Sequence, residues 1–188
     1  MTIQGVLFPI ISAVWLVSEI LLAKFKFSKS ENSSDKSTLK LLWTVILLSI
    51  FLGFLIRTSG LGSFSSHIYV IYFSGLFLIL LGLVIRWIAI LTLKQSFTVD
   101  VSVAADQSIV ESGIYRHVRH PAYLGSLLSF LGLGLALVNW LSVLIIFVPI
   151  FFAFSRRINV EESVLKKSFG ERYVHYCNQT KRLIPGVY

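Results

Sequence analysis

The feature that most constrains the fold of this chain is a series of long apolar runs with short polar intervals between them. Hydrophobic residues make up 55% of the 188 residues, whereas soluble domains usually contain about 45–50%. Charged residues make up only 14% and gather between the apolar runs, because each charge in bilayer hydrocarbon costs about 2.5–3.5 kcal/mol or more. The pattern predicts an all-α integral membrane protein, folded as one compact membrane domain.

The apolar runs predict five transmembrane helices, because about 20 residues at 1.5 Å per residue cross about 30 Å of hydrocarbon. We place these spans at about residues 2–23, 39–58, 68–93, 121–138 and 141–155. Asn139 and Trp140 break the apolar run and predict a helical hairpin between the fourth and fifth spans. No glycine or proline stands between Arg157 and Gly170, so we expect this helix to continue into the aqueous phase as a C-terminal helix.

Three polar intervals connect the other spans. Residues 24–40 are rich in Ser, Asn and Lys and show no apolar periodicity, so we expect an unpacked connector there. Residues 59–63 form a short Gly/Ser link. We expect a loop at residues 94–120, with a short extended piece in it at 97–101 or 109–115.

The distribution of Lys and Arg predicts the orientation. Five of the 17 lie between the first and second spans, three between the third and fourth, and seven after the fifth. These 15 residues fall on one face, which the positive-inside rule assigns to the cytoplasm. We therefore expect the N-terminus outside and the C-terminus inside. The net charge of +8 is attributed to loops that face anionic lipid and not to nucleic-acid binding.

Three isolated residues are given simple interpretations. Glu19 lies near the end of the first span, where we expect its carboxylate to stay hydrated, with a buried functional acid as the alternative. Arg86 lies about two turns from the end of the third span, and we expect it to snorkel to the interface, with contact to an anionic group as the alternative. Cys177 is the single cysteine, which excludes an internal disulfide and a multi-cysteine metal site.

Two clusters of functional side chains lie at the ends of apolar runs. Residues 115–123 hold two Arg, two His and two Tyr around Pro121. They suit either an interfacial belt or a site for a carboxylate or phosphate. In the second cluster Arg157 and Glu161 share a helical face, while Glu162 points about 100° away. The alternative is a solvated helix start, with Arg157 paired to Glu161 and Glu162 paired to Lys166.

The sequence excludes zinc, phosphate-loop, dinucleotide-fold and serine-hydrolase sites, because the motif of each one is missing. No His or Cys spacing suggests zinc, no Gly-rich run follows a strand, and no Gly-x-Ser-x-Gly occurs. We expect no bound metal.

The two clusters and the tail occur in an order that resembles a known family. The first motif, which begins at Gly113, reads Gly-Ile-Tyr-Arg-x-x-Arg-His-Pro-x-Tyr-Leu-Gly. The second begins at Phe151 and reads Phe-Phe-x-x-x-Arg-Arg-Ile-x-x-Glu-Glu, followed by Phe-Gly-x-x-Tyr-x-x-Tyr and, near the C-terminus, Ile-Pro. This order resembles the isoprenylcysteine carboxyl methyltransferase family over the C-terminal 80 or so residues. It also resembles phospholipid N-methyltransferases and, more weakly, the C-terminal part of membrane sterol reductases.

The resemblance implies S-adenosylmethionine as the methyl donor and a lipophilic acceptor that arrives from the bilayer. It divides the chain into a membrane scaffold, residues 1–93, and a cofactor-binding and catalytic part, residues 94–188. By matching positions, the catalytic pair is Arg157 and Glu161. The matching cofactor contacts are Tyr115, Arg119, His120, Pro121, Tyr123 and Glu162.

The sequence leaves alternatives for the methyl acceptor and for the functional class. We expect O-methylation of a carboxylate such as that of a prenylcysteine, with lipid-amine N-methylation as the alternative. A non-enzymatic scaffold whose basic tail binds anionic lipid is a third possibility. The short chain resembles the family's prokaryotic members, so we expect it in the inner membrane of a prokaryotic cell.

Overall fold

A computed structural model describes residues 3–25, 33–94 and 108–184, with side chains described for 6–22, 37–94 and 108–184. Its elements are α1 (Ile3–Phe25), α2 (Ser33–Ser59), α3 (Ile68–Leu93), the 3₁₀ helix η2 (Gly113–Arg116), α4 (Pro121–Ala136), α5 (Trp140–Phe169) and α6 (Glu171–Gln179). In the described ranges, β pairing is limited to two isolated bridges, Ser63 with Asn139 and Val118 with Lys181. The predicted all-α class is confirmed.

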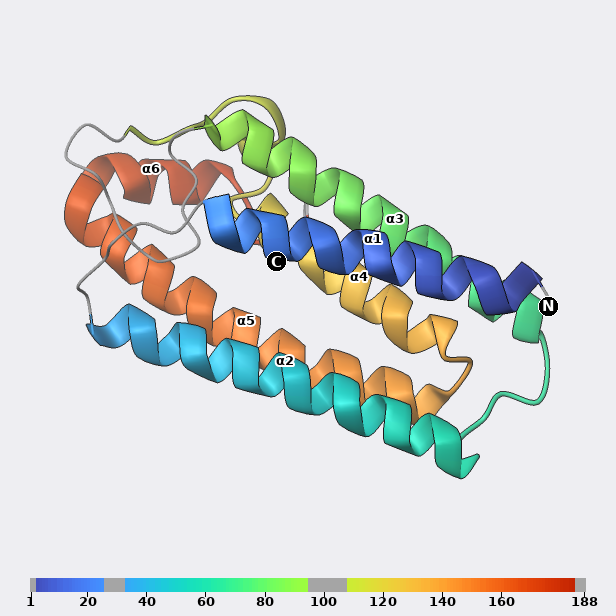
Figure 1. Cartoon of the computed structure of the whole chain (residues 1–188). Coiled ribbons are helices and arrows are strands. Elements are labelled where there is room, and N and C mark those ends of the chain that lie inside the picture. The colour runs from blue at the N-terminus through green and yellow to red at the C-terminus, as the bar shows by residue number, and fades with distance from the viewer. Residues whose placement is uncertain (1–2, 26–32, 95–107, 185–188) are drawn as a thin grey trace.

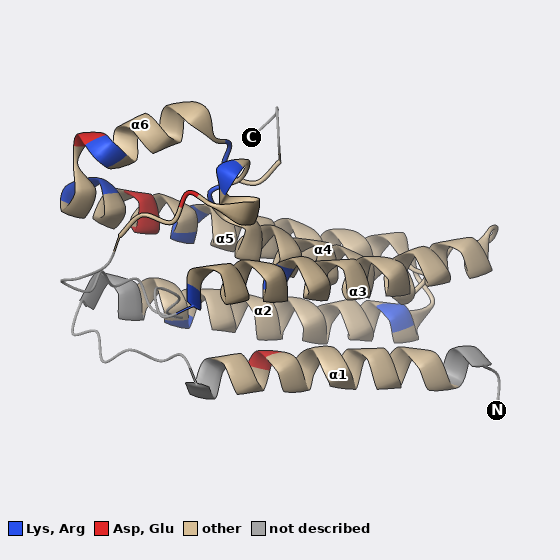
Figure 2. Cartoon of the chain, turned by 90° about the horizontal axis from the view of Figure 1, so that it is seen from above, with Lys and Arg blue, Asp and Glu red and all other residues tan. Residues whose placement is uncertain are grey.

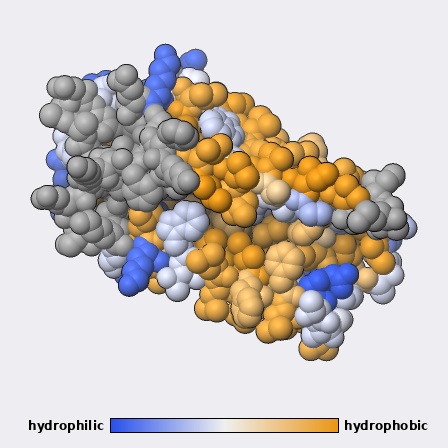
Figure 3. Space-filling view, viewed as in Figure 1, coloured by the Kyte–Doolittle hydropathy of each residue, from blue (hydrophilic) through white to orange (hydrophobic). Residues whose placement is uncertain are grey.

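Among the described residues, three helices are long and apolar enough to cross a bilayer: Ser37–Ser59 of α2, Ile68–Leu93 and Trp140–Phe169. Val6–Leu22 of α1 and Pro121–Ala136 are apolar but shorter. Hydrophobic side chains cover the middle of the molecular surface in the view of Figure 3, as expected for helices that face lipid. The chain is therefore a multi-pass membrane protein.

Helices α1 to α5 lie roughly along a common axis, and α6 folds back at one end (Figure 1). Helix α4 packs between α3 and α5, α2 packs along α5, and α1 lies against α3. Figure 2 shows most of the charged residues gathered at the end where α6 lies. The bundle thus has one polar end, and the start of α4 and the end of α5 meet there.

Close packing of α3 on α4 depends on small residues at the interface. A Cβ at Gly132 of α4 would lie 2.5 Å from the Gly75 carbonyl oxygen of α3, and one at Gly75 would lie 2.5 Å from the Ala136 nitrogen. Glycines let two helix backbones approach in a membrane, where packing replaces the hydrophobic driving force. Helix α4 also approaches α5 closely, since a Cβ at Gly134 of α4 would lie 2.8 Å from the Val143 Cα of α5.

The predicted hairpin between the fourth and fifth spans is confirmed, with α4 ending at Ala136, two residues earlier than expected. Val138 adopts a positive φ of 53° and reverses the chain. The Asn139 side chain then caps α5 by accepting from the Ser142 amide at 2.9 Å, and donates to the Leu61 carbonyl at 2.5 Å. Asn139 is fully buried, so one side chain both starts α5 and holds the α2–α3 link.

The remaining element predictions have mixed outcomes. Helix α3 has the predicted bounds, and α5 continues to Phe169 as expected, where Gly170 with a φ of +55° ends it. Residues 33–40, predicted as part of an unpacked connector, instead form the first turns of α2, because Thr38 is buried in the packed bundle. Residues 108–112 form no regular element and residues 113–115 belong to η2, while residues 97–101 lie outside the described part of the chain.

The first interpretations of Glu19 and Arg86 are wrong, and the alternative for Arg86, contact with an anionic group, is confirmed. Arg86 of α3 does not snorkel: its Nε lies 2.6 Å from Glu19 Oε1 of α1, and its Nη2 donates to Glu19 Oε2 at 2.8 Å. Its Nη1 donates to Ser126 Oγ at 2.8 Å and to the Ala122 carbonyl at 3.2 Å, both on α4. Pairing inside the bundle keeps both charges out of lipid without any need to reach the interface.

Candidate functional site

Three chain segments converge at the polar end of the bundle: the residues that lead into α4, the last turns of α5, and the segment after α6. The last segment runs beside the first, since the Arg119 amide donates to the Lys181 carbonyl at 2.8 Å. The His120 amide likewise donates to the Arg182 carbonyl at 3.0 Å. These backbone bonds hold the tail against the start of α4, where the next residue, Pro121, is buried in the first helical turn.

The carboxylate of Glu162 is the centre of the site. It is only 3% exposed, and it accepts from Arg119 Nε at 3.1 Å and from Arg182 Nη2 at 2.6 Å. The Nε2 atom of His120 lies 3.3 Å from its Oε1. Charge-assisted bonds of this kind are what allow a carboxylate to be buried. The alternative of a solvated pair with Lys166 is therefore wrong for Glu162.

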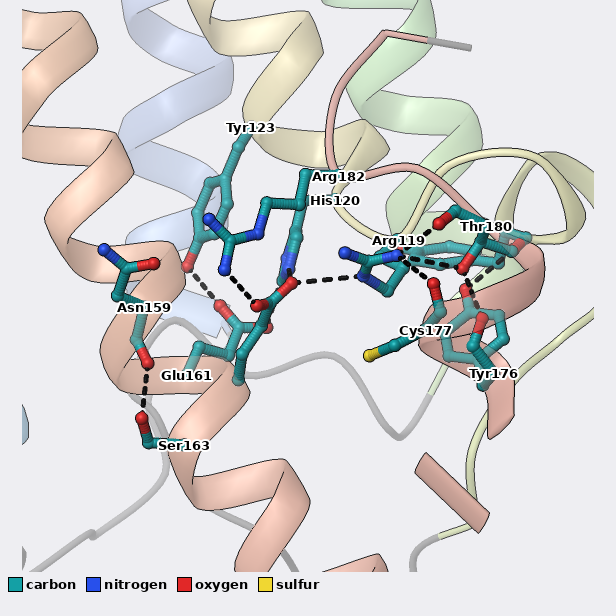
Figure 4. Close-up of polar contacts among 12 residues, drawn as sticks. Arg119, His120, Tyr123, Asn159, Glu161, Ser163, Tyr176, Cys177, Thr180 and Arg182 are labelled. Carbon is teal, nitrogen blue, oxygen red and sulfur yellow. Dashed lines mark hydrogen bonds and ion pairs between the residues drawn. The ribbon is translucent and has the colours of Figure 1, made fainter. Parts of the chain in front are cut away.

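Arg119 also fastens α6 to the site (Figure 4). Its Nη1 donates to the carbonyl of Cys177 at 3.0 Å and to that of Thr180. A cation at the C-terminal carbonyls of a helix is favourable because those groups have no partner within the helix. Arg119 thus connects Glu162 of α5 to the end of α6.

A second cluster, next to Glu162, is built around the hydroxyl of Tyr123. This hydroxyl donates to Glu161 Oε2 at 2.7 Å and accepts from Arg157 Nε at 3.3 Å. Arg157 is 2% exposed, and its Nη1 donates to Thr38 Oγ1 of α2 at 3.3 Å. The Tyr123 ring stacks on that of His120 with centroids 5.7 Å apart. The two clusters therefore form one continuous site.

The predicted site residue Tyr115 has a side chain that lies apart from this network. It is buried in a small apolar cluster with Ala89 and Ala122, and its carbonyl accepts from Tyr176 Oη at 2.7 Å. The structure brings together the side chains of Arg119, His120, Tyr123, Arg157, Glu161 and Glu162. The individual roles assigned to all these residues remain predictions.

Sequence reasoning missed two partners. Arg182 belongs to the tail that precedes the Ile-Pro of the motif, so its place near that motif was a usable signal. Thr38 gave no signal, because a single threonine at the start of an apolar run is common in any membrane helix. Its contact with Arg157 joins residues 119 positions apart.

The buried tyrosines and the cysteine of this region lie in environments that keep them neutral. Burial raises the pKa of Tyr115, Tyr173 and Tyr176 above the ordinary value, and acidic neighbours such as Glu161 raise that of Tyr115 further. Burial also raises the pKa of the Cys177 thiol. These groups therefore act as donors or packing groups, and the site does not contain a thiolate nucleophile at Cys177.

The chain is similar in sequence to known methyltransferases. Residues 70–172 match the phospholipid methyltransferase family. Protein-S-isoprenylcysteine O-methyltransferase B of Arabidopsis thaliana is 35% identical over 115 residues, which cover 60% of this chain and 58% of that protein. The protein-S-isoprenylcysteine O-methyltransferase of Saccharomyces cerevisiae is 36% identical over 115 residues, covering 60% and 48%.

A solved structure has a similar fold. The eukaryotic intramembrane Ras methyltransferase, an isoprenylcysteine carboxyl methyltransferase, superposes with a TM-score of 0.63 at 30% identity, covering 77% of this chain and 52% of that one. The chain thus spans about half the length of the relatives it matches. These similarities confirm the resemblance that the two motifs indicated. Because the family match extends over more than half of its length, the chain belongs to the phospholipid methyltransferase family.

Proposed function

We propose that this protein is an S-adenosylmethionine-dependent membrane methyltransferase that O-methylates the carboxylate of a prenylcysteine-like lipid. The observation that supports it most is the buried guanidinium of Arg157, which shares the Tyr123 hydroxyl with Glu161 toward the polar end of the apolar helix α5. A buried arginine is suited to a carboxylate, because its planar N–H groups match the two oxygens. The names of the similar proteins supply the acceptor class.

The exposed rim of the site fits the cofactor. Glu161 and Arg182 keep 29% and 28% of their side chains exposed, while Glu162 and His120 are buried behind them. The guanidinium of Arg182 at this rim complements the carboxylate of the cofactor's amino-acid group. When bound, S-adenosylmethionine supplies a methyl group on a cationic sulfur. Arg182 thereby joins the cofactor contacts that the resemblance assigns to Tyr115, Arg119, His120, Pro121, Tyr123 and Glu162.

The residues at the reacting end work by position and charge. Arg157 would orient the acceptor carboxylate, which is already deprotonated, so its oxygen would accept the methyl group without a general base. The sulfur–methyl bond would break, and the cofactor would leave as a neutral thioether. Glu161 favours positive charge at the reacting end. Catalysis then comes from alignment and electrostatic stabilisation, which together account for many orders of magnitude in rate.

The membrane disposition belongs to the same proposal. Helices α1 and α4 act as the two shorter spans beside α2, α3 and α5, which makes five. The polar end with the site faces the cytoplasm, together with the C-terminus, and the N-terminus faces outward. In this arrangement residues 1–93 form a membrane scaffold, and residues 94–188 bind a soluble cofactor. The inner membrane of a prokaryotic cell is the proposed location.

The first test is calorimetry of the detergent-solubilised protein with S-adenosylhomocysteine. We expect binding, and its absence would contradict both methyltransferase hypotheses and favour a non-enzymatic membrane scaffold. The second test offers labelled donor with either a prenylcysteine analogue or phosphatidylethanolamine. The description of the matching family favours lipid-amine methylation as the second candidate, and transfer to phosphatidylethanolamine alone would establish it in place of the first.

A further inference from the structure

We propose that two hydroxyl groups, those of Thr38 and Tyr123, form a clamp that sets the plane of the Arg157 guanidinium for the acceptor carboxylate. The inference rests on the proposed carboxylate methylation. It assigns a role to an α2 residue outside the matched residues 70–172. It also assigns the Tyr123 hydroxyl to the acceptor end of the site and not to the cofactor.

The clamp acts on two different nitrogen atoms of Arg157. Nε donates to the Tyr123 hydroxyl at 3.3 Å, and Nη1 donates to Thr38 Oγ1 at 3.3 Å. A guanidinium is planar, so two contacts on separate nitrogens determine the direction of its plane. The oxygens belong to α4 and α2, while the arginine belongs to α5. Three helices are therefore needed to orient this one side chain.

The Tyr123 hydroxyl is already engaged on both sides. It accepts from Arg157, and its single proton is donated to Glu161 at 2.7 Å. A phenol has one proton to donate, so this hydroxyl has no proton left for the cofactor. Its ring contacts the rings of His120 and Phe154, with centroids 5.7 Å and 5.2 Å away. These contacts hold the hydroxyl beside Arg157 and Glu161. Tyr123 is thus a positioning residue for Arg157 and Glu161.

Through Thr38, helix α2 takes part in positioning Arg157. The residue is buried, and α2 packs along α5 over much of its length. A second hydroxyl contact joins the same two helices far from the site, where Ser142 Oγ donates to the Gly53 carbonyl at 2.7 Å. Register between α2 and α5 is thereby set at both ends. A small shift of a recognition group changes rates by as much as about 10²-fold, so this register matters for turnover.

The chain offers matched controls for both hydroxyls. Thr44 lies on α2, is exposed, and donates only to its own helix at the Lys40 carbonyl, at 2.9 Å. Tyr69 lies on α3 with 67% of its surface exposed. Thr38→Val and Thr44→Val remove the same atom, and Tyr123→Phe and Tyr69→Phe do likewise. Thr38→Ser restores the hydroxyl with less side-chain bulk.

The experiment measures four quantities for each variant: kcat/KM with a prenylcysteine analogue, the preference for the free acid over its methyl ester in binding, the Kd for S-adenosylhomocysteine, and the Tm. For Thr38→Val and Tyr123→Phe we expect kcat/KM to fall about tenfold or more, the size of one lost charge-assisted hydrogen bond. The preference for the acid should fall with it. The Kd for S-adenosylhomocysteine should stay within about twofold, and Thr38→Ser, Thr44→Val and Tyr69→Phe should behave as wild type.

Three results would overturn the clamp. Wild-type kcat/KM in both clamp variants would remove it directly. A Thr38→Ser variant as impaired as Thr38→Val would show that Thr38 only fills space. A raised Kd for S-adenosylhomocysteine in Tyr123→Phe, with the acid preference unchanged, would return Tyr123 to the cofactor. If the wild-type protein methylates phosphatidylethanolamine alone, the acceptor in the proposed function fails first and the clamp falls with it.

Discussion

Arg86 of α3 and Glu19 of α1 form an ion pair within the helix bundle, with Arg86 Nε 2.6 Å from Glu19 Oε1. Both side chains are largely buried, with exposed fractions of 13% and 17%. The guanidinium also donates to Ser126 of α4 at 2.8 Å. Helix α1 is thus tied through one residue to the helix that begins at the functional site. In the residues next to the pair on each helix, Trp87 Nε1 donates to Ser18 Oγ at 2.7 Å.

This relationship predicts an unequal cost for two neighbouring substitutions. Glu19→Gln leaves a buried cation without its counter-charge, which costs roughly 3 kcal/mol or more. Ser18→Ala removes a neutral hydrogen bond between the same helices, which costs about 1 kcal/mol. Unfolding in detergent by SDS titration, followed by circular dichroism, measures the difference. Equal destabilisation by both changes would show that the charge of the pair contributes nothing.

His120→Ala is expected to weaken cofactor binding, because the imidazole contacts Glu162 and stacks on Tyr123 at the centre of the site. Calorimetry with S-adenosylhomocysteine measures the effect. His117→Ala is the control, since His117 is an exposed histidine three residues earlier. Unchanged affinity together with a lower Tm would mean that His120 serves only the packing of α4.

The two adjacent acids are expected to differ in the quantity that each one controls. Glu161→Gln should lower turnover by about 10²-fold with little change in cofactor affinity, because it removes charge at the reacting end. Glu162→Gln should raise the cofactor Kd by roughly ten- to a hundredfold, from the loss of a charge-assisted bond of about 1.5–3 kcal/mol. Because Glu162 forms ion pairs with Arg119 and Arg182, the Glu162→Gln variant should also have a lower Tm.

Calorimetry and single-turnover methyl transfer separate these effects. Wild-type behaviour of both variants would withdraw the catalytic assignment of this cluster.

The orientation predicts that positions 36 and 181 face the same side of the membrane, because 15 of the 17 Lys and Arg lie on one side of five spans. Single cysteines at these positions, in a Cys177→Ser background, are labelled with a membrane-impermeant maleimide before and after permeabilisation. We expect both to react only after the cytoplasmic face is opened. Labelling from opposite sides would refute the five-span arrangement.

The sequence by itself determined the five apolar helices and several of their ends. Apolar runs of sufficient length specify membrane helices because backbone polar groups in lipid have to bond within their own segment. Asn139 predicted the α4–α5 hairpin, and Gly170 predicted the end of α5, because both act through bonds or backbone angles within a few residues. The two motifs also identified most of the side chains that meet at the site.

Only the tertiary structure decided which partners those side chains have. On one helix Glu162 and Lys166 are possible neighbours, yet burial against α4 and the tail gives Glu162 the partners Arg119, His120 and Arg182. The contacts of Thr38 with Arg157 and of Glu19 with Arg86 likewise join residues far apart in the chain. Helical periodicity reports which residues share a face, but the packing of one helix on another determines what that face meets, and this depends on register and approach distances set by residues such as Gly75 and Gly132.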